Sequence, residues 1–166
     1  CYTITIDPTN TNRVYLGTSS GLYRSLDGGL TWSRISSPTS ITPPVGTVLN
    51  SCRGADITPD GRFVYAVFHA NTGSNSGTGT GAAGSGTGQA YPSVWVAEVN
   101  NASTTWTWTQ VAGPDSDGNN ATGASNGLYY SEARAAATSP VHTYYWKPLI
   151  DPRSTATEHK VIIGCM

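Results

Sequence analysis

Residues 25–32 read SLDGGLTW, and this octapeptide decides how the rest of the chain is interpreted. An Asp between a Ser and two glycines accepts hydrogen bonds from the N–H groups of its own turn. Gly28 and Gly29 tolerate the positive φ angles that a tight hairpin requires. Trp32 begins the next extended segment, where its ring would pack between sheets. The stretch therefore predicts a hairpin turn in which Asp27 is structural rather than catalytic or metal-binding.

The composition of the chain excludes several classes of protein. Its 166 residues are enough for one domain with a core. A net charge of -1, with 11% charged residues, argues against a nucleic-acid-binding surface. No apolar run reaches the roughly 18 residues that span a bilayer, so no membrane insertion is expected. The histidines and cysteines show no metal-ligand spacing, and we predict no metal site and no cofactor.

Extended segments dominate the sequence. Residues 2–6, 93–99 and 105–111 alternate between apolar and polar side chains, while 13–17 and 62–67 are rich in β-branched and aromatic residues. Turn signals rich in Asp, Gly and Pro separate them. No segment keeps a 3.6-residue period over three turns. The pattern predicts an all-β, antiparallel fold.

The extended segments recur as a repeat. Residues 1–8, CYTITIDP, align with residues 52–59, CRGADITP, and each copy leads through a short turn into a second strand. The first unit contains four short strands and ends near Ile35, and the second unit also contains four. Four antiparallel strands in about 40 to 50 residues match the size of a propeller blade.

A third copy has two alternative alignments. The first begins at Ala133 and leads into the strand around Tyr145, and we prefer it because Arg134 then falls opposite Arg53. The other begins at Leu149, where LIDP resembles the IDP of the first unit.

The octapeptide is a complete match to the Asp-box, or BNR repeat, Ser-x-Asp-x-Gly-x-Thr-Trp. The matching residues are Ser25, Asp27, Gly29, Thr31 and Trp32. A degenerate copy in the second unit, residues 99–106, keeps Thr105 and Trp106 and has Asn101 and Ser103 in place of Asp27 and Gly29. The chain thus resembles the Asp-box β-propeller superfamily, which includes sialidases, family 74 xyloglucan-cleaving hydrolases and sortilin-type receptors.

This resemblance implies antiparallel four-stranded blades of a partial Asp-box β-propeller. We expect a first blade at 1–40, a second blade at 41–113 with a low-complexity insertion at 71–92, and a partial third blade with a long loop at 114–166. A closed propeller has at least about four blades. The expected partners are therefore a second copy of the chain or the missing blades of a longer chain.

The propeller interpretation also places two cysteines at equivalent positions on neighbouring inner strands. Cys1 and Cys52 are therefore predicted to form a disulfide, which leaves Cys165 to pair elsewhere.

We expect a non-catalytic, extracellular recognition or assembly module, with glycans among its ligands. The alternative is a fragment of a secreted glycoside hydrolase, sialidase-like or xyloglucanase-like. A sialidase-like site would use a Tyr nucleophile, a Glu and arginines that grip a carboxylate. The candidates are Tyr130, Glu132, Arg134 and Arg53, but a third arginine and the Arg-Ile-Pro signature are missing.

The sequence favours a secreted protein. It begins at Cys1 without an initiator Met, which indicates that a signal peptide was removed or that the chain is a piece of a longer one. Sequons at Asn101 and Asn120 predict glycosylation in a secretory route.

Overall fold

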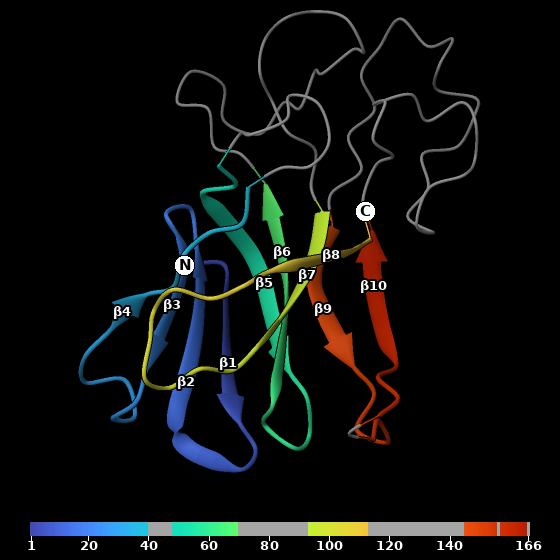
Figure 1. Cartoon of the computed structure of the whole chain (residues 1–166), viewed down its shortest axis with the longest axis horizontal. Coiled ribbons are helices and arrows are strands. Elements are labelled where there is room, and N and C mark those ends of the chain that lie inside the picture. The colour runs from blue at the N-terminus through green and yellow to red at the C-terminus, as the bar shows by residue number, and fades with distance from the viewer. Residues whose placement is uncertain (40–47, 70–92, 113–144, 156, 166) are drawn as a thin grey trace, which may run out of the picture.

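The computed structural model describes residues 1–39, 48–69, 93–112, 145–155 and 157–165 (Figure 1). Within these ranges the regular structure is entirely β-strand, and all strand pairs are antiparallel. The prediction of an all-β, antiparallel fold with four-stranded blades is confirmed. No helix in the described part of the chain is long and apolar enough to cross a membrane.

The first sheet has the strand order β1-β2-β3-β4. Its strands are β1 (Thr3–Asp7), β2 (Asn10–Thr18), β3 (Gly21–Ser25) and β4 (Ser33–Arg34). Gly21 sits in the tight β2–β3 turn with φ 121°, and Gly28 and Gly29 take φ 73° and 100° in the β3–β4 turn. These positive angles are open to glycine at little cost, which is why the hairpins form there.

The second sheet repeats this order as β5-β6-β7-β8. Its strands are β5 (Ser51–Ile57), β6 (Phe63–His69), β7 (Ser93–Glu98) and β8 (Thr109–Ala112). We expected the fourth strand to begin near Thr105, but it begins at Thr109. The reason is that the backbone of Trp106 bonds instead to the side chain of Ser36, two residues past β4.

The two sheets share a register as well as an order. Ile4 pairs with Leu16 and Ile6 with Val14, while Ala55 pairs with Ala66 and Ile57 with Val64. These pairs occupy the same places when 1–8 is aligned with 52–59. The sequence repeat is therefore also a structural repeat.

A third, two-stranded sheet follows the second. It pairs β9 (Tyr145–Ile150) with β10 (Val161–Cys165), and β9 lies against β5 and β6. Because β9 precedes the turn at Asp151 and Pro152, this hairpin corresponds to the alignment that begins at Leu149. The preferred alignment is thus wrong in treating the strand around Tyr145 as second in its unit, while its start at Ala133 lies outside the described residues, as does the 71–92 insertion.

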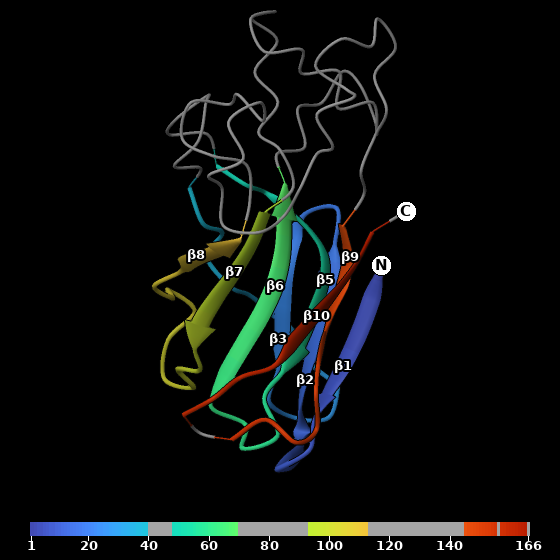
Figure 2. The same cartoon turned by 90° about the vertical axis from the view of Figure 1, so that its right-hand side faces the viewer.

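The sheets stand side by side and pack face to face, as Figures 1 and 2 show. The inner strand β5 lies against β1, β2 and β3 of the first sheet. The core between them is apolar and aromatic, and it draws on both sheets and on the segments beside them: Tyr15, Leu22, Ile35, Leu49, Cys52, Ala55, Ile57, Val64, Ala66, Phe68, Trp95, Ala97 and Trp106. Burial of this surface, at roughly 25 cal/mol per Å², is what holds one sheet on the next.

Candidate functional site

The turn between β3 and β4 is closed by the Asp27 side chain. Asp27 Oδ1 accepts hydrogen bonds from the Ser25 hydroxyl at 2.7 Å and from the Thr31 N–H at 2.8 Å. The Thr31 hydroxyl donates to Oδ2 at 2.5 Å. These bonds, those from Thr31 first, lower the pKa of Asp27 from its ordinary 3.8 to about 2. The carboxylate is therefore charged at neutral pH and belongs to the turn.

The corresponding turn after β7 is closed differently. Asn100 Oδ1, one residue earlier, accepts from the Ala102 N–H at 3.0 Å, and Ser103 Oγ accepts from the Thr105 N–H at 2.9 Å. The side chain of Asn101 is left to accept a bond from the first sheet. The two turns still share their tryptophan contact: Trp32 Nε1 donates to the Gly29 carbonyl, and Trp106 Nε1 donates to the Ser103 carbonyl.

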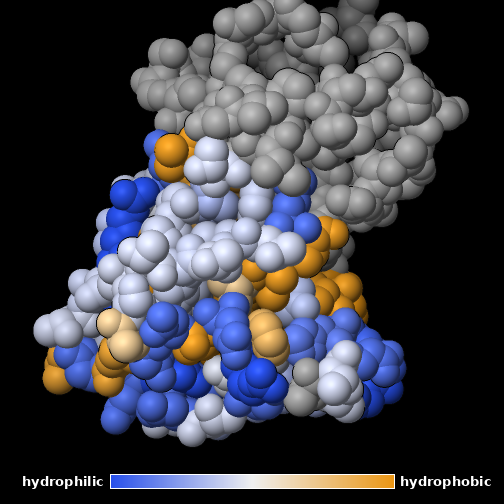
Figure 3. Space-filling view, in the orientation of Figure 1, coloured by the Kyte–Doolittle hydropathy of each residue, from blue (hydrophilic) through white to orange (hydrophobic). Residues whose placement is uncertain are grey.

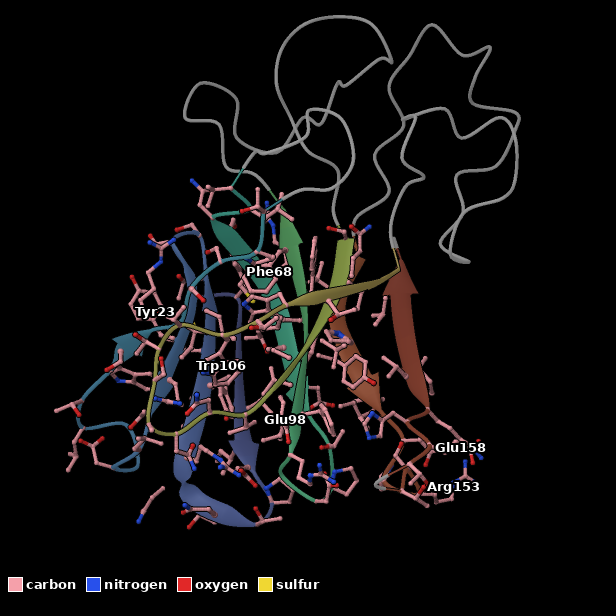
Figure 4. All side chains as sticks on the ribbon, in the orientation of Figure 1. Tyr23, Phe68, Glu98, Trp106, Arg153 and Glu158 are labelled. Atoms are coloured by element: carbon pink, nitrogen blue, oxygen red, sulfur yellow. The ribbon has the colours of Figure 1, made fainter. Side chains whose placement is uncertain are left out.

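These two equivalent tryptophans lie in opposite environments. Trp106 is 6% exposed and packs edge-on against Tyr15 of the first sheet, with ring centroids 6.1 Å apart (Figure 4). Trp32 is 36% exposed. We expected Trp32 to be buried between sheets, but no described sheet lies on its side of the first sheet.

Two arginines of the first sheet hold the second turn in place. Arg13 forms a buried ion pair with Asp7, and it also donates to the Gly61 carbonyl at 2.9 Å and to Asn101 Oδ1 at 3.2 Å. Arg24 donates to the carbonyls of Asn100 and Asn101, and its guanidinium lies 5.7 Å from the Trp106 ring centroid. Each guanidinium thus joins two sheets.

Burial of these groups changes their titration. Desolvation raises the pKa of Tyr15 to about 12 and lowers the pKa of Arg24. Sequence reasoning missed both arginines and Tyr15. No local signal would have found them, because their partners lie far away along the chain.

A further contact repeats at equivalent positions of the inner strands. The Thr5 hydroxyl donates to the Ala55 carbonyl at 2.7 Å and so joins β1 to β5. Asp56 Oδ2 accepts from the Ile150 N–H at 2.9 Å and joins β5 to β9, with Lys147 Nζ 3.6 Å from Oδ1. Thr5 and Asp56 coincide when the two repeats are aligned, and this periodicity was a signal available in the sequence.

Every described carboxylate is engaged by a neighbour. Asp7, Asp56, Glu98, Asp151 and Glu158 pair with Arg13, Lys147, Arg62, Arg153 and Lys160, respectively. Asp27 and Asp60 close turns. The described residues hold no cluster of three or more His, Cys, Asp or Glu that suits a metal ion.

The predicted sialidase-like group is mostly outside the described residues. Tyr130, Glu132 and Arg134 lie there, as does the sequon at Asn120. Arg53 lies in β5 and stacks on the ring of Tyr2, with its guanidinium carbon 4.5 Å from the centroid.

The predicted Cys1–Cys52 disulfide is not supported. Both thiols are free; Cys1 is exposed, whereas Cys52 is fully buried in the core. Burial raises the pKa of the Cys52 thiol, which keeps it protonated and unreactive. Although the two residues are equivalent in the repeat, their side chains lie in different environments.

A second contact between the second and third sheets, besides the one at Asp56, involves Tyr65 and His159. Tyr65, the counterpart of Tyr15, bonds through its hydroxyl to His159 Nδ1 at 2.7 Å, and the two rings stand edge to face. His159 Nε2 is buried and has no hydrogen-bond partner. The contact anchors the β9–β10 hairpin on the second sheet.

Comparison with known proteins shows what the chain is similar to. No family model matches it, and no curated protein sequence matches it. A crystal structure of an ancestral GH74 enzyme matches 98% of this chain at 28% sequence identity, with a TM-score of 0.58. The class defined by the fold is therefore a propeller-type, all-β protein. The match spans only 15% of that enzyme's length.

Proposed function

We propose that this chain supplies neighbouring blades of an extracellular Asp-box β-propeller and that its described blades serve in recognition or assembly rather than in catalysis. The propeller part of this proposal is supported by the repeated sheets and by the match to a GH74 enzyme. The non-catalytic part rests on one observation. Each of the seven described carboxylates is paired with a cation or closes a turn.

Incubation of the purified chain with β-glucan and sialoside substrates tests the non-catalytic role. We expect no release of reducing ends or sialic acid above the blank, because no free carboxylate pair is available in the described blades. Hydrolysis that survives the combined substitutions Glu132→Gln, Asp115→Asn and Asp117→Asn would contradict the proposal, since the acid would then have to come from one of the seven described carboxylates.

A second candidate is that the chain is a fragment of a secreted glycoside hydrolase. The similarity to an ancestral GH74 enzyme favours it, although fold alone does not define activity. In this case the reacting groups would be drawn from the segment that holds Tyr130, Glu132 and Arg134, or from blades beyond the chain. Hydrolysis abolished by Glu132→Gln, with folding unchanged by circular dichroism, would support this candidate.

Secretion and glycosylation are also part of the proposal. Asn101 is exposed, as glycan attachment requires. Expression in a secreting eukaryotic host should give a protein whose mass falls on treatment with peptide N-glycosidase. Asn101→Gln, with Asn120→Gln as the matched variant, shows which sequon is used; no mass change in the wild-type chain would refute glycosylation.

A further inference from the structure

We propose that the outer face of the first sheet, together with the Ser25–Trp32 turn, is a docking site for an arginine-bearing β-sheet of the same repeat type. The guanidinium of that sheet would bind the Asp27 turn and lie over Trp32. This inference rests on the proposed function, in which the chain supplies neighbouring blades, and it adds the position and chemistry of the partner.

The template is the interface inside the chain. The turn at 99–106 receives two guanidinium groups from the preceding sheet. Arg24 binds the backbone carbonyls of Asn100 and Asn101 and stacks on Trp106, while Arg13 binds Asn101 Oδ1. The turn is thus an acceptor site for arginines on the sheet that comes before it.

The Ser25–Trp32 turn presents the same acceptors with more charge. In the repeat, Leu26 and Asp27 correspond to Asn100 and Asn101, and Trp32 corresponds to Trp106. In the alignment a carboxylate therefore replaces a neutral amide, although Asp27 also accepts bonds from Ser25 and Thr31 within its own turn, so that a docking guanidinium would share the carboxylate with the turn. Hydrogen bonds between a guanidinium and a carboxylate are shorter and stronger than those to an amide. Charge complementarity thus favours arginine as the group that docks here.

The sheet beside this turn presents an uncovered apolar face. Ile4 and Ile6 are 59% and 57% exposed, whereas their counterparts Ala55 and Ile57 are buried against the first sheet. Leu26, Leu30 and Trp32, in the turn itself, are also exposed, and Figure 3 shows separate apolar patches at the lower left, where the β3–β4 turn lies. The same face is therefore buried in the second sheet and exposed in the first sheet. An exposed apolar face of this kind suits burial by another sheet of the same repeat type.

The occupant is a preceding blade rather than a second copy. At its other end the described chain offers only the two-stranded sheet β9–β10, which lacks the third strand that carries Arg24 in the first sheet. The GH74 enzyme that matches 98% of this chain is far longer, which leaves room for a preceding sheet there. A sheet like the first one would suit, because its Arg13 and Arg24 already bind the equivalent turn of the second sheet.

A tandem protein tests the proposal by placing residues 1–50 directly ahead of the whole chain. The added copy carries Trp32→Phe, so that hydroxyl-radical footprinting reports on the Trp32 of the original chain alone. In the unmodified chain we expect Trp32 to be oxidised at least about fivefold faster than Trp106. In the tandem protein the oxidation of Trp32 should slow to the rate of Trp106.

The guanidinium is tested by substitutions in the added copy. Arg24→Met should restore the fast oxidation of Trp32. Arg34→Met is the matched control and should leave Trp32 protected, because the Arg34 guanidinium donates to Ser37 and, among the described residues, to no acceptor of the second sheet's turn. Asp27→Asn in the original chain should weaken the protection without unfolding the turn.

Three outcomes would overturn the proposal. Trp32 could be oxidised as fast in the tandem protein as in the unmodified chain. This result counts against the proposal even if circular dichroism shows that the added copy is unfolded. Arg24→Met could leave the protection unchanged. The unmodified chain could sediment as a dimer with Trp32 protected, which would make a second copy the occupant. None of these results depends on the hydrolysis assay, so failure of this inference and failure of the proposed function are distinguishable.

Discussion

Trp106 stands edge-on to Tyr15, with ring centroids 6.1 Å apart and an interplanar angle of 66°. The two rings come from different sheets, and this contact places a side chain of the second turn against the face of the first sheet. Trp32 occupies the equivalent position, but no ring contact to it occurs among the described residues. Comparing substitutions at the two tryptophans therefore measures how much burial between sheets contributes to the free energy of unfolding.

Trp106→Ala should destabilise the chain by about 3–5 kcal/mol, because it empties a filled site between two sheets. Trp32→Ala should cost roughly half as much, since part of its ring already faces water. Urea denaturation followed by circular dichroism measures both. Equal losses for the two variants would contradict the difference in burial.

Arg13→Met should cost about 3–5 kcal/mol, because it leaves the Asp7 carboxylate buried without its cation. Adding Asp7→Asn to this variant should recover part of the loss, since the remaining side chain is neutral and still accepts from Thr9. Arg62→Met is the control. Its ion pair with Glu98 is exposed, and its loss should cost less than about 1 kcal/mol.

The Asp27 turn should loosen in acid. Its pKa is lowered from 3.8 to about 2, so its stabilising contribution is present above pH 3.8 and is lost as the pH falls through about 2. The protection of the Thr31 amide proton, measured by NMR between pH 5 and pH 2 and expressed relative to the intrinsic exchange rate at each pH, should therefore fall at the acid end. Asp27→Asn should remove this pH dependence; a variant that behaves like the wild type would show that another group controls the turn.

Gly54→Ala should detach the β9–β10 hairpin from the second sheet. A Cβ at this position would clash with the Lys147 Cα, a backbone contact that no side-chain rotation relieves. Hydrogen exchange should show lost protection in β9 while β2 and β3 remain protected, which serves as an internal control. Unchanged protection in β9 would show that the hairpin does not sit as closely on β5 as described.

Much of the fold was predictable because its signals are local. Alternation in 2–6 and 93–99 marks strands, and the Gly28-Gly29 pair marks a hairpin, since only neighbouring residues decide these features. The repeat of CYTITIDP and CRGADITP also located two equivalent sheets. The third unit is harder to align from sequence, because the Ile-Asp-Pro turn at 150–152, which follows β9, competes with the match between Arg134 and Arg53.

The sequence by itself determined the strands, the tight turns and their recurrence, because each depends on backbone preferences of adjacent residues. Only the tertiary structure decided whether residues at equivalent positions of the two repeats lie in the same environment. Cys1 and Cys52 separate into solvent and core, and Trp32 and Trp106 separate into an exposed and a buried ring. The physical reason is that burial depends on what lies across the interface, and in the described part of the chain a second sheet covers only one face of the first.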